Sequence, residues 1–395
     1  MSRLWDKGAS LDDRVLRYTA GEDHTLDERL VAYDVLASTA HADMLHAQGL
    51  IEAADHAAIV EGLAALASEH ADGAWTISLE EEDVHTALES RLTARIGAAG
   101  GRLHLGRSRN DQVLAALRLY LRDACDGLGE RLQALIAALF ELAGREAETA
   151  LPGYTHLQQA MPSSVALWAG GFAGGLDDNV AALSGVKRRL GASPLGSAAG
   201  YGTPGVPIDR EATATSLGFD RVEQPVTAVQ LARGKAEAHL CFEITMMLGD
   251  AARLAADLLL FYTQEFAYVS LPESLTTGSS IMPQKRNPDV LELVRAAPAT
   301  AQACLDECLM ITQKLTSGYH RDLQRLKAPL FRAIDLADDT LAIMKPMLDG
   351  VAFRPENITL SPGIHAAEEA NRLVVEQGMS FRDAYREVGK RFSGA

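Results

Sequence analysis

The chain is poor in aromatic residues (6% of 395) and in positive charge, since 37 Lys and Arg face 53 Asp and Glu for a formal net charge of −16. Nucleic acids and anionic membranes bind proteins through clustered Lys and Arg, so this charge balance argues against both as partners. No run of 18 or more apolar residues could span a bilayer, and the opening residues MSRLWDK lack the apolar run of a signal peptide. We therefore expect a protein of the cytoplasm, with neither a nucleic-acid nor a membrane partner.

Cysteine is scarce as well. The four cysteines, in a chain of this length, do not make a disulfide framework. Cys304 and Cys308 stand four residues apart on a predicted helix, which could place two thiolates on one face. Because no partnering Cys or His pair lies nearby, small buried residues are favoured over a metal site. The full set is Cys125, Cys241, Cys304 and Cys308.

Nucleotide-binding signatures are also missing. The Gly-rich stretch PLGSAAGYG at 194–202 has no preceding strand and is not followed by Gly-Lys-Ser/Thr. We interpret it as a structural turn between helices, and expect no nucleotide site.

What the chain has in abundance is helix formers. Between Asp111 and Glu148, leucines and other apolar residues recur at steps of three and four, which predicts one very long amphipathic helix. Similar segments run from Ala228 to Phe266 and from Pro288 past Leu309, and no regular array of strands is predicted. Helices of this length bury their apolar stripes most easily alongside one another. The predicted fold class is therefore all-α, with a central bundle of long helices.

Shorter helical pieces and clusters of Pro and Gly predict the division into domains. Helical segments at 26–48 and 79–96 come before the first long helix, and a Pro- and Gly-containing break lies at 354–363. The predicted domains are an N-terminal helical domain (1–105), a central long-helix bundle (106–350) and a small, shortened C-terminal helical domain (351–395).

The most informative segment is GSSIMPQKRNPD at 278–289. Asn287 suits a helix N-cap, Pro288 the first helical position and Asp289 the first turn. The loop before them would then face the positive end of a helix. With its small residues, backbone N–H groups and Lys285, it could hold a carboxylate or a developing oxyanion. The alternative is a flexible surface loop in front of a well-capped helix.

This segment resembles the signature loop of the fumarase/aspartase superfamily, whose enzymes cleave a C–N or C–O bond and release fumarate. The resemblance implies that Ser279 is the general base that removes the β-proton of a succinyl group. It also implies that Lys285 and Asn287 hold the carboxylate and stabilise the aci-carboxylate. A serine is a poor base at its ordinary pKa, so donors and positive charge must surround its oxygen, and the loop composition supplies both.

Residues 104–113, HLGRSRNDQV, resemble the stretch that grips the fumarate half of the substrate in the argininosuccinate lyase family. The match implies substrate contacts by Ser108, Arg109 and Asn110. Ser108 followed by Asp111 also resembles a capping box that would start the long helix whatever its function. Both interpretations hold together, because a helix N-terminus beside an Arg is a natural carboxylate site. Leu105 stands where many members have Thr.

Residues 153–158, GYTHLQ, resemble the second superfamily segment. A lone His in a helical protein is more often a packed or surface residue than a catalyst. The resemblance implies instead that Thr155 binds substrate and that His156 protonates the leaving nitrogen. Glu292 would be the carboxylate that orients and polarises His156.

Superfamily members differ on the leaving-group side. Residues 317–327, SGYHRDLQRLK, match an argininosuccinate lyase segment, which implies substrate contacts by Tyr319, Gln324 and Lys327. A polar helix face with no role in binding is the alternative.

Two further positions are candidates for substrate contact. His85 follows Asp83 and Val84 in a segment that resembles the N-terminal substrate segment of the family. Arg233, in LARGK at 231–235, matches an Arg that many members flank with two Asp; here both Asp are replaced, as in a subgroup of bacterial members.

The motifs run in the family's order from Leu4 to Tyr385. The resemblance implies an argininosuccinate lyase of arginine biosynthesis that acts by anti β-elimination and needs no metal or organic cofactor. It also implies a homotetramer whose active sites each draw segments from three chains. Two alternatives stay open: a sibling lyase that releases fumarate from another N-succinyl compound, and a catalytically silent structural protein on the same scaffold.

Overall fold

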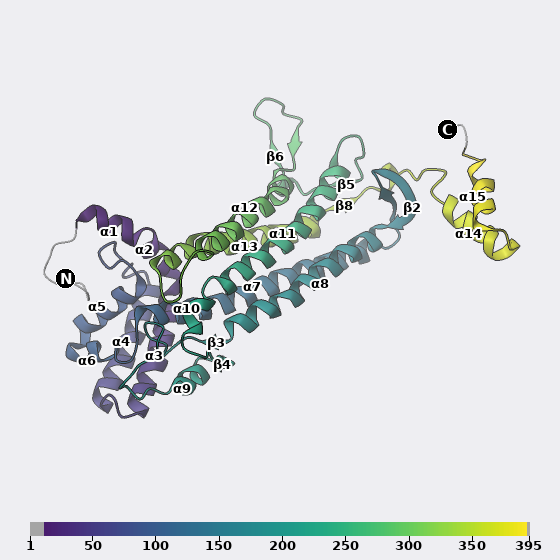
Figure 1. Ribbon diagram of the computed structural model, residues 1–395. Helices are drawn as coiled ribbons and strands as arrows, with labels where there is room; N and C mark the ends of the chain where they lie inside the picture. The colour runs from purple at the N-terminus through teal and green to yellow at the C-terminus, as the bar shows by residue number, and fades with distance from the viewer. Residues whose placement is uncertain (1–11, 393–395) are drawn as a thin grey trace. The chain divides into compact units, whose positions relative to one another are not determined.

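The computed structural model describes residues 12–392 (Figure 1), so the opening residues that were searched for a signal peptide lie outside the described part. Helices dominate it, and the predicted all-α class is confirmed. Within residues 12–392, no helix combines the length and hydropathy needed to cross a bilayer.

Five helices of 24 residues or more form the bundle. The first of them confirms the long helix predicted from Asp111 to Glu148, because regularly spaced leucines such as Leu121, Leu132 and Leu139 are buried along one stripe. The five are α7 (Arg109–Arg145), α8 (Val165–Leu190), α11 (Lys235–Tyr262), α12 (Asp289–Thr312) and α13 (Lys327–Gly350).

Two compact units divide the chain, and each long helix contributes residues to both. Unit 1 takes in the residues up to Leu128, Ala182–Thr245 and Thr300–Leu336. Unit 2 takes in Gly129–Ala181, Met246–Ala299 and the residues from Ala337 on. The division predicted from chain order, at 105 and 350, stays a prediction.

Short helices surround the bundle segments of unit 1. Gly62 of α4 (Ala53–Ala71) lies against α5 (Val84–Ile96), and an added Cβ would meet Leu92 Cδ1 at 2.6 Å, so the two helices approach closely there. The predicted turn at 194–202 is confirmed, because it joins β3 to the segment before α9 without regular structure. The elements are α1 (Asp13–Ala20), α2 (Asp23–Leu26), η1 (Asp27–Leu30), α3 (Val31–Ala47), α4 (Ala53–Ala71), α5 (Val84–Ile96), α6 (Ala98–Arg102), β3 (Ala192–Ser193), α9 (Arg210–Ser216), β4 (Arg221–Val222), α10 (Ala228–Ala232) and η3 (Arg321–Leu326).

Unit 2 contains helix segments that lie side by side and several short strands. The indole of Trp168 on α8 donates to Asp257 of α11 at 2.9 Å, and its ring packs near Phe261 and Phe353. The remaining elements are the antiparallel hairpin β1 (Ala150–Thr155) and β2 (Gln158–Ser164), β5 (Val269–Ser270) paired with β8 (Ala352–Phe353), β6 (Thr277–Gly278) paired with β7 (Arg286–Asn287), η2 (Glu273–Leu275), η4 (Pro355–Asn357), α14 (Ala366–Gln377) and α15 (Phe381–Gly389).

One predicted helix is interrupted. The segment from Ala228 to Phe266 is split into α10 and α11, because Arg233 is extended (φ −61°, ψ 140°) and Gly234 has φ +85°. A Cβ at 234 would also meet Thr312 Cγ2 at 2.3 Å. Both the backbone angle and the close approach therefore require glycine. Because of this break, Arg233 lies between the two helices and belongs to neither.

The start predicted for α12 is also wrong by one residue. Asn287 is not the N-cap, because it pairs with Thr277 in the β6–β7 ladder. The helix begins at Asp289, and the carbonyl of Pro288 accepts the first helical hydrogen bond, from the N–H of Glu292 at 3.2 Å. The strands themselves were not predicted, since their sequences show no alternation of apolar and polar residues.

Candidate active site

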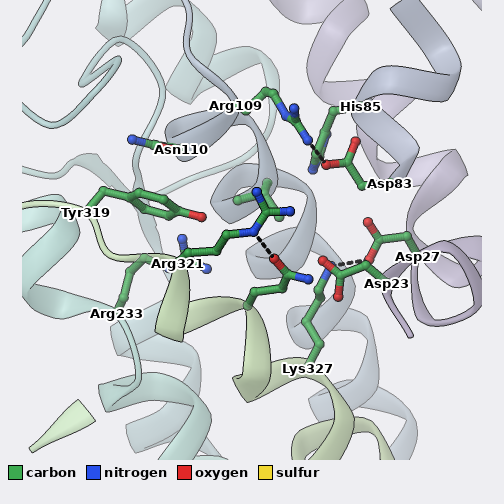
Figure 2. Close-up of a pocket in the computed structure, with 12 residues that line it drawn as sticks. Asp23, Asp27, Asp83, His85, Arg109, Asn110, Arg233, Tyr319, Arg321 and Lys327 are labelled. Carbon is green, nitrogen blue, oxygen red and sulfur yellow. Dashed lines mark hydrogen bonds and ion pairs between the residues drawn. The ribbon is translucent and has the colours of Figure 1, made fainter. Parts of the chain in front are cut away.

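Unit 1 contains a highly charged pocket of about 220 Å³ (Figure 2). Seven of the residues predicted to bind substrate line it, although they come from four separate stretches of the chain. They are His85, Arg109, Asn110, Arg233, Tyr319, Gln324 and Lys327. The other lining residues are Asp23, Asp27, Asp83, Val113 and Arg321.

Lys327 anchors the acidic side of the pocket. This lysine begins α13 and is 3% exposed, and its ammonium group pairs with Asp27 and, at 3.0 Å, with Asp23. Burial raises the pKa of Asp23 to about 7, which outweighs the lowering by Lys327, whose charge is shared with Asp27. Burial lowers the pKa of Lys327, but the two carboxylates outweigh it and the net direction is upward.

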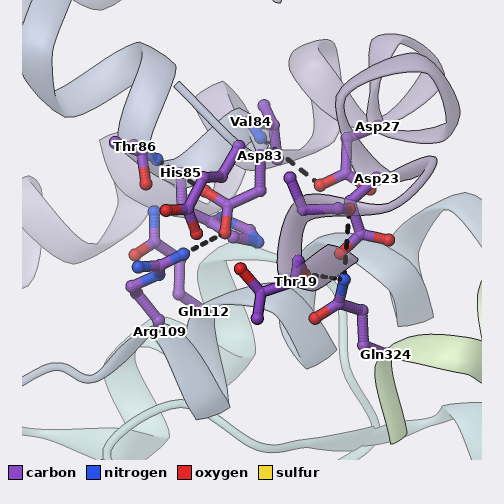
Figure 3. A network of polar contacts seen from close by, with 12 residues as sticks. Thr19, Asp23, Asp27, Asp83, Val84, His85, Thr86, Arg109, Gln112 and Gln324 are labelled. Carbon is purple, nitrogen blue, oxygen red and sulfur yellow. Dashed lines mark hydrogen bonds and ion pairs between the residues drawn. The ribbon is translucent and has the colours of Figure 1, made fainter. Parts of the chain in front are cut away.

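Arg109 and Asp83 form a second ion pair in the pocket (Figure 3). Asp83 is the N-cap of α5 and accepts from the N–H of Thr86 at 2.9 Å. Burial opposes its ionisation, but His85 and Arg109 outweigh burial and lower the pKa of Asp83 to about 2. The carboxylate therefore stays charged and holds both the helix start and the Arg109 guanidinium.

Within residues 12–392, Arg233 is the pocket cation that forms no hydrogen bond or ion pair. It is 6% exposed, its Nε and Nη1 atoms are buried without a hydrogen bond, and its guanidinium carbon lies 5.7 Å from the centre of the Tyr319 ring. Burial is the leading cause that lowers its pKa. A buried guanidinium with unpaired donors is suited to donate hydrogen bonds to a carboxylate group of a ligand.

The amide of Gln324 is already partnered within the protein. It donates to the carbonyls of Thr19 at 2.8 Å and Ala20 at 3.2 Å, and it accepts from Arg321 Nε at 3.0 Å. These contacts fix η3 against the end of α1. Gln324 therefore lines the pocket with its side chain held in one orientation by these hydrogen bonds.

Ser108 caps α7, as the sequence predicts. Its Oγ accepts from the N–H of Asn110 at 3.3 Å, and its own N–H donates to Asp111 at 3.0 Å. Asp111 also accepts from the N–H groups of Gly196 and Ala198, so the Gly-rich turn is tied to the start of α7. Asn110 and Arg109 are thereby held in the first turn of a long helix beside the pocket.

The signature loop belongs to unit 2 and is exposed. Strands β6 and β7 close its base, and Ile281 within it is 85% exposed. Ser279 Oγ accepts from the N–H groups of Ile281 at 3.3 Å and Met282 at 3.1 Å. These are two backbone donors around the serine oxygen. Within residues 12–392, the Lys285 ammonium group forms no hydrogen bond or ion pair.

His156 occupies the tip of the β1–β2 hairpin, also in unit 2. The two-residue turn consists of His156 and Leu157, both with positive φ (54° and 59°), the pattern of a type I′ turn. Thr155, His156 and Glu292 are all exposed. In the described part of the single chain no hydrogen bond joins His156 to Glu292 or to Ser279, so their predicted partnership stays a prediction.

Two acidic residues of the pocket were not predicted from the sequence, and three more lining residues, Asp83, Val113 and Arg321, had no predicted role. Asp23 and Asp27 stand four apart in a helical segment, which is a usable signal for a shared face. Their partner, Lys327, lies 300 residues further on, so neither the ion pair nor its burial can be inferred from spacing. Asp83 and Arg321 stood inside motifs that were recognised. The four cysteines are buried and free.

Comparison with known proteins gives consistent matches over almost the whole chain. A family model described as Lyase matches residues 14–302. The argininosuccinate lyase of Sorangium cellulosum is 46% identical over 388 residues, which covers 98% of this chain and 90% of that protein. The argininosuccinate lyase of Thermotoga neapolitana is 38% identical over 392 residues, covering 99% and 98%.

Solved structures give the same fold. An EDDS lyase in complex with formate superposes with a TM-score of 0.80 at 26% identity, covering 97% of this chain and 76% of that one. The class II fumarase of Schistosoma mansoni has a TM-score of 0.77 at 16% identity, covering 95% and 91%, and so shares the fold alone.

Proposed function

This chain belongs to the argininosuccinate lyase family of the fumarase/aspartase superfamily, and we propose that it cleaves argininosuccinate to arginine and fumarate in arginine biosynthesis. The reaction is an anti β-elimination: a base removes a β-proton of the succinyl group, the C–N bond breaks and the guanidine leaves. One observation carries the proposal. Seven of the ten residues predicted to bind substrate line a single pocket.

The pocket suits a substrate with both signs of charge. Argininosuccinate combines carboxylates with a guanidine and an ammonium group. Arg233 offers two unpaired buried donors to a carboxylate, and Arg109 begins a helix whose N-terminus favours anions. The pKa of Asp23 is about 7, so its carboxyl group is near half ionisation at neutral pH. A cationic group of the ligand would favour the charged form of this carboxyl group.

Ser279 is the proposed base. The two backbone N–H groups that donate to Oγ would stabilise negative charge on it, which is the condition for a serine to accept a proton. Lys285 and Asn287 are the proposed holders of the substrate carboxylate as the carbanion develops. We further propose that the loop closes over substrate, with Gly278 as a hinge.

His156 is the proposed acid-side group, with Thr155 at the substrate and Glu292 as its carboxylate partner. The three lie on exposed surfaces of the single chain. This agrees with the proposal that active sites are completed by residues from three subunits. The single chain defines where these side chains lie, and the proposed assembly would supply the residues that contact them.

We also propose a homotetramer in the cytoplasm. Several large apolar side chains on the long helices are exposed in the single chain, among them Phe140 (59%) and Leu167 (68%). Exposed apolar residues of this size are typical of surfaces that pack against another chain. Light scattering should give about four times the chain mass of 42.3 kDa, and a monomeric mass would contradict shared active sites.

A second candidate is a sibling lyase with the same elimination chemistry and another N-succinyl amine as substrate. Two observations favour it: Arg233 lacks the flanking Asp residues found in many members, and the solved structure of an EDDS lyase shares this fold. A catalytically silent scaffold is the third alternative and has no specific support, since Ser279, His156, Lys285 and Glu292 are all present.

The deciding measurement is the ultraviolet absorbance of fumarate after the protein is mixed with argininosuccinate. Adenylosuccinate and a simple N-succinyl amine serve as controls. Rapid release from argininosuccinate alone supports the proposal. Fumarate release only from another compound would support the sibling lyase instead. No release from any of the compounds would contradict both proposals.

A further inference from the structure

Behind the pocket lies a buried network that the elimination mechanism does not use. Asp34 of α3 is fully buried, and its carboxylate accepts from His85 Nδ1, from Gln112 Nε2 at 3.0 and 3.1 Å, and from Ser38 Oγ at 2.8 Å. Ser38 Oγ in turn accepts from Arg107 Nη1 at 2.8 Å. This carboxylate joins three helices and is not among the residues that line the pocket.

His85 connects this network to the pocket. It lies in the first turn of α5, is 3% exposed and lines the pocket, while Nδ1 is used by Asp34. The other ring nitrogen, Nε2, is buried and has no hydrogen-bond partner within the described residues. A buried ring nitrogen without a partner at a pocket wall is suited to form a hydrogen bond with a ligand.

The contact with Asp34 decides what Nε2 can bind. An ionised carboxylate can only accept, so Nδ1 carries the proton and the neutral ring would present Nε2 as an acceptor. The charged ring presents Nε2–H as a donor. The titratable groups that face His85 are mostly acidic, namely Asp27 of η1, Asp34 of α3, Asp83 at the start of α5 and His104.

These carboxylates favour the charged ring. Burial would lower the pKa of His85, but Asp34 first, followed by Asp83 and Asp27, outweighs burial, and the net direction is upward. Asp34 itself shows the complementary shift: burial raises its pKa, and His85 with Arg107 outweighs burial so that the carboxylate stays ionised. The two groups therefore stabilise each other as an ion pair.

We propose that Asp34 is a positioning residue that holds His85 as an imidazolium, with Nε2–H directed at a carboxylate of the substrate. This inference rests on the proposed function, because it assigns His85 to anion recognition in the same pocket. Asp34 does not touch the substrate and acts through His85. The two unpartnered donors of the pocket, Arg233 and His85 Nε2, then serve the same class of ligand group.

The test combines Asp34→Asn, His85→Asn and the double variant, with Ser38→Ala as the matched control. Asn at 34 still accepts from Nδ1 but loses the charge, so the neutral ring would turn an acceptor towards the substrate carboxylate. Ser38→Ala removes a hydrogen bond to the other oxygen of Asp34 and leaves the contact with His85 intact. Steady-state kinetics on argininosuccinate and calorimetric binding of succinate are the two measurements.

We expect Asp34→Asn and His85→Asn each to raise KM and the Kd for succinate about tenfold, with kcat changed less than about threefold. The double variant should be no worse than His85→Asn, because one residue acts through the other. Ser38→Ala should stay within about twofold of the wild type. Effects that multiply in the double variant, or a Ser38→Ala effect as large as that of Asp34→Asn, would overturn the proposal.

A measurement on the wild-type protein covers the case in which Asp34→Asn does not fold. Nuclear magnetic resonance of protein labelled with ¹⁵N in the histidine rings should show both nitrogens of His85 protonated at pH 7, and succinate should shift Nε2. His85→Asn identifies the signal. A neutral His85 ring would refute the inference. Succinate binding with these properties but no fumarate release would refute the proposed function and leave the inference standing.

Discussion

The two compact units present their polar residues in opposite ways. In unit 1 the candidate binding residues line one pocket, and His85, Arg233 and Lys327 among them are buried. Ion pairs join Lys327 to Asp27 and Arg109 to Asp83. In unit 2 the candidate catalytic residues stand on an exposed loop and at the tip of an exposed hairpin. The proposed binding residues are thus gathered within the fold of one chain, whereas the residues proposed to do chemistry form no hydrogen bond or ion pair with one another in the described part of that chain.

The largest expected effect tests the exposed region. Ser279→Ala should lower kcat for fumarate release about 10⁴-fold, roughly 5.5 kcal/mol of barrier, because it removes the proposed base for the β-proton. Succinate binding and the thermal midpoint should change little, since Ser279 is not buried. The control is Ser280→Ala, at the neighbouring exposed serine. Turnover of Ser279→Ala at the wild-type rate would eliminate Ser279 as the base.

Lys327→Met tests the buried region. Removal of the ammonium group leaves Asp23 and Asp27 buried without their common cation, which should lower the free energy of unfolding by about 3–5 kcal/mol. Urea denaturation at a fixed protein concentration measures the loss. Lys345→Met removes an exposed lysine and provides the comparison. Equal stability of the two variants would mean that the pocket ion pairs are not the buried type described above.

The pH dependence of stability sharpens the same contrast. The pKa of Asp23 rises to about 7 on folding, so the protonated form is favoured in the folded state and stabilises it below about pH 4. That contribution is lost as the pH rises from about 4 to 7. The stability of the wild type relative to Asp23→Asn should therefore fall by on the order of 2–4 kcal/mol over this range. Denaturation curves at several pH values measure this difference. The control is Asp322→Asn, at an exposed position, for which we expect no comparable change in relative stability with pH.

The smallest effect belongs to the exposed ion pairs of unit 2. Arg131 and Asp338 pair at 2.7 Å with nearly half of each side chain exposed. Arg131→Gln should change the free energy of unfolding by less than about 1 kcal/mol, because water solvates the charges of an exposed pair in the folded and unfolded states alike. A loss comparable to that of Lys327→Met would remove the distinction between the units.

The sequence predicted the long helices well because their periodicity is a local property. The leucine spacing after Asp111 requires only that one face of α7 be buried, and the cap at Ser108 involves residues three apart. The break at Gly234 was missed because it depends on Thr312, a contact between distant segments. The β6–β7 ladder moved the start of α12 for the same reason.

The candidate site shows the same difference between what local sequence can predict and what depends on contacts between distant segments. Motif resemblance selected seven residues that the fold brings to one pocket, although spacing alone could not have gathered them. It did not select Asp23 and Asp27, because their significance arises from burial with Lys327. The roles of Ser279, His156, Lys285 and Glu292 stay predictions, since within residues 12–392 these side chains form no hydrogen bond or ion pair with one another.

The turn at His156 and Leu157 also has a consequence for the stability of the hairpin. Two left-handed residues in succession are best supplied by Asn-Gly, and a side chain with a branched or bulky Cβ substituent destabilises the turn. The tip of this hairpin therefore holds two side chains in a backbone conformation that each of them disfavours, so the β1–β2 ladder must hold the turn in place.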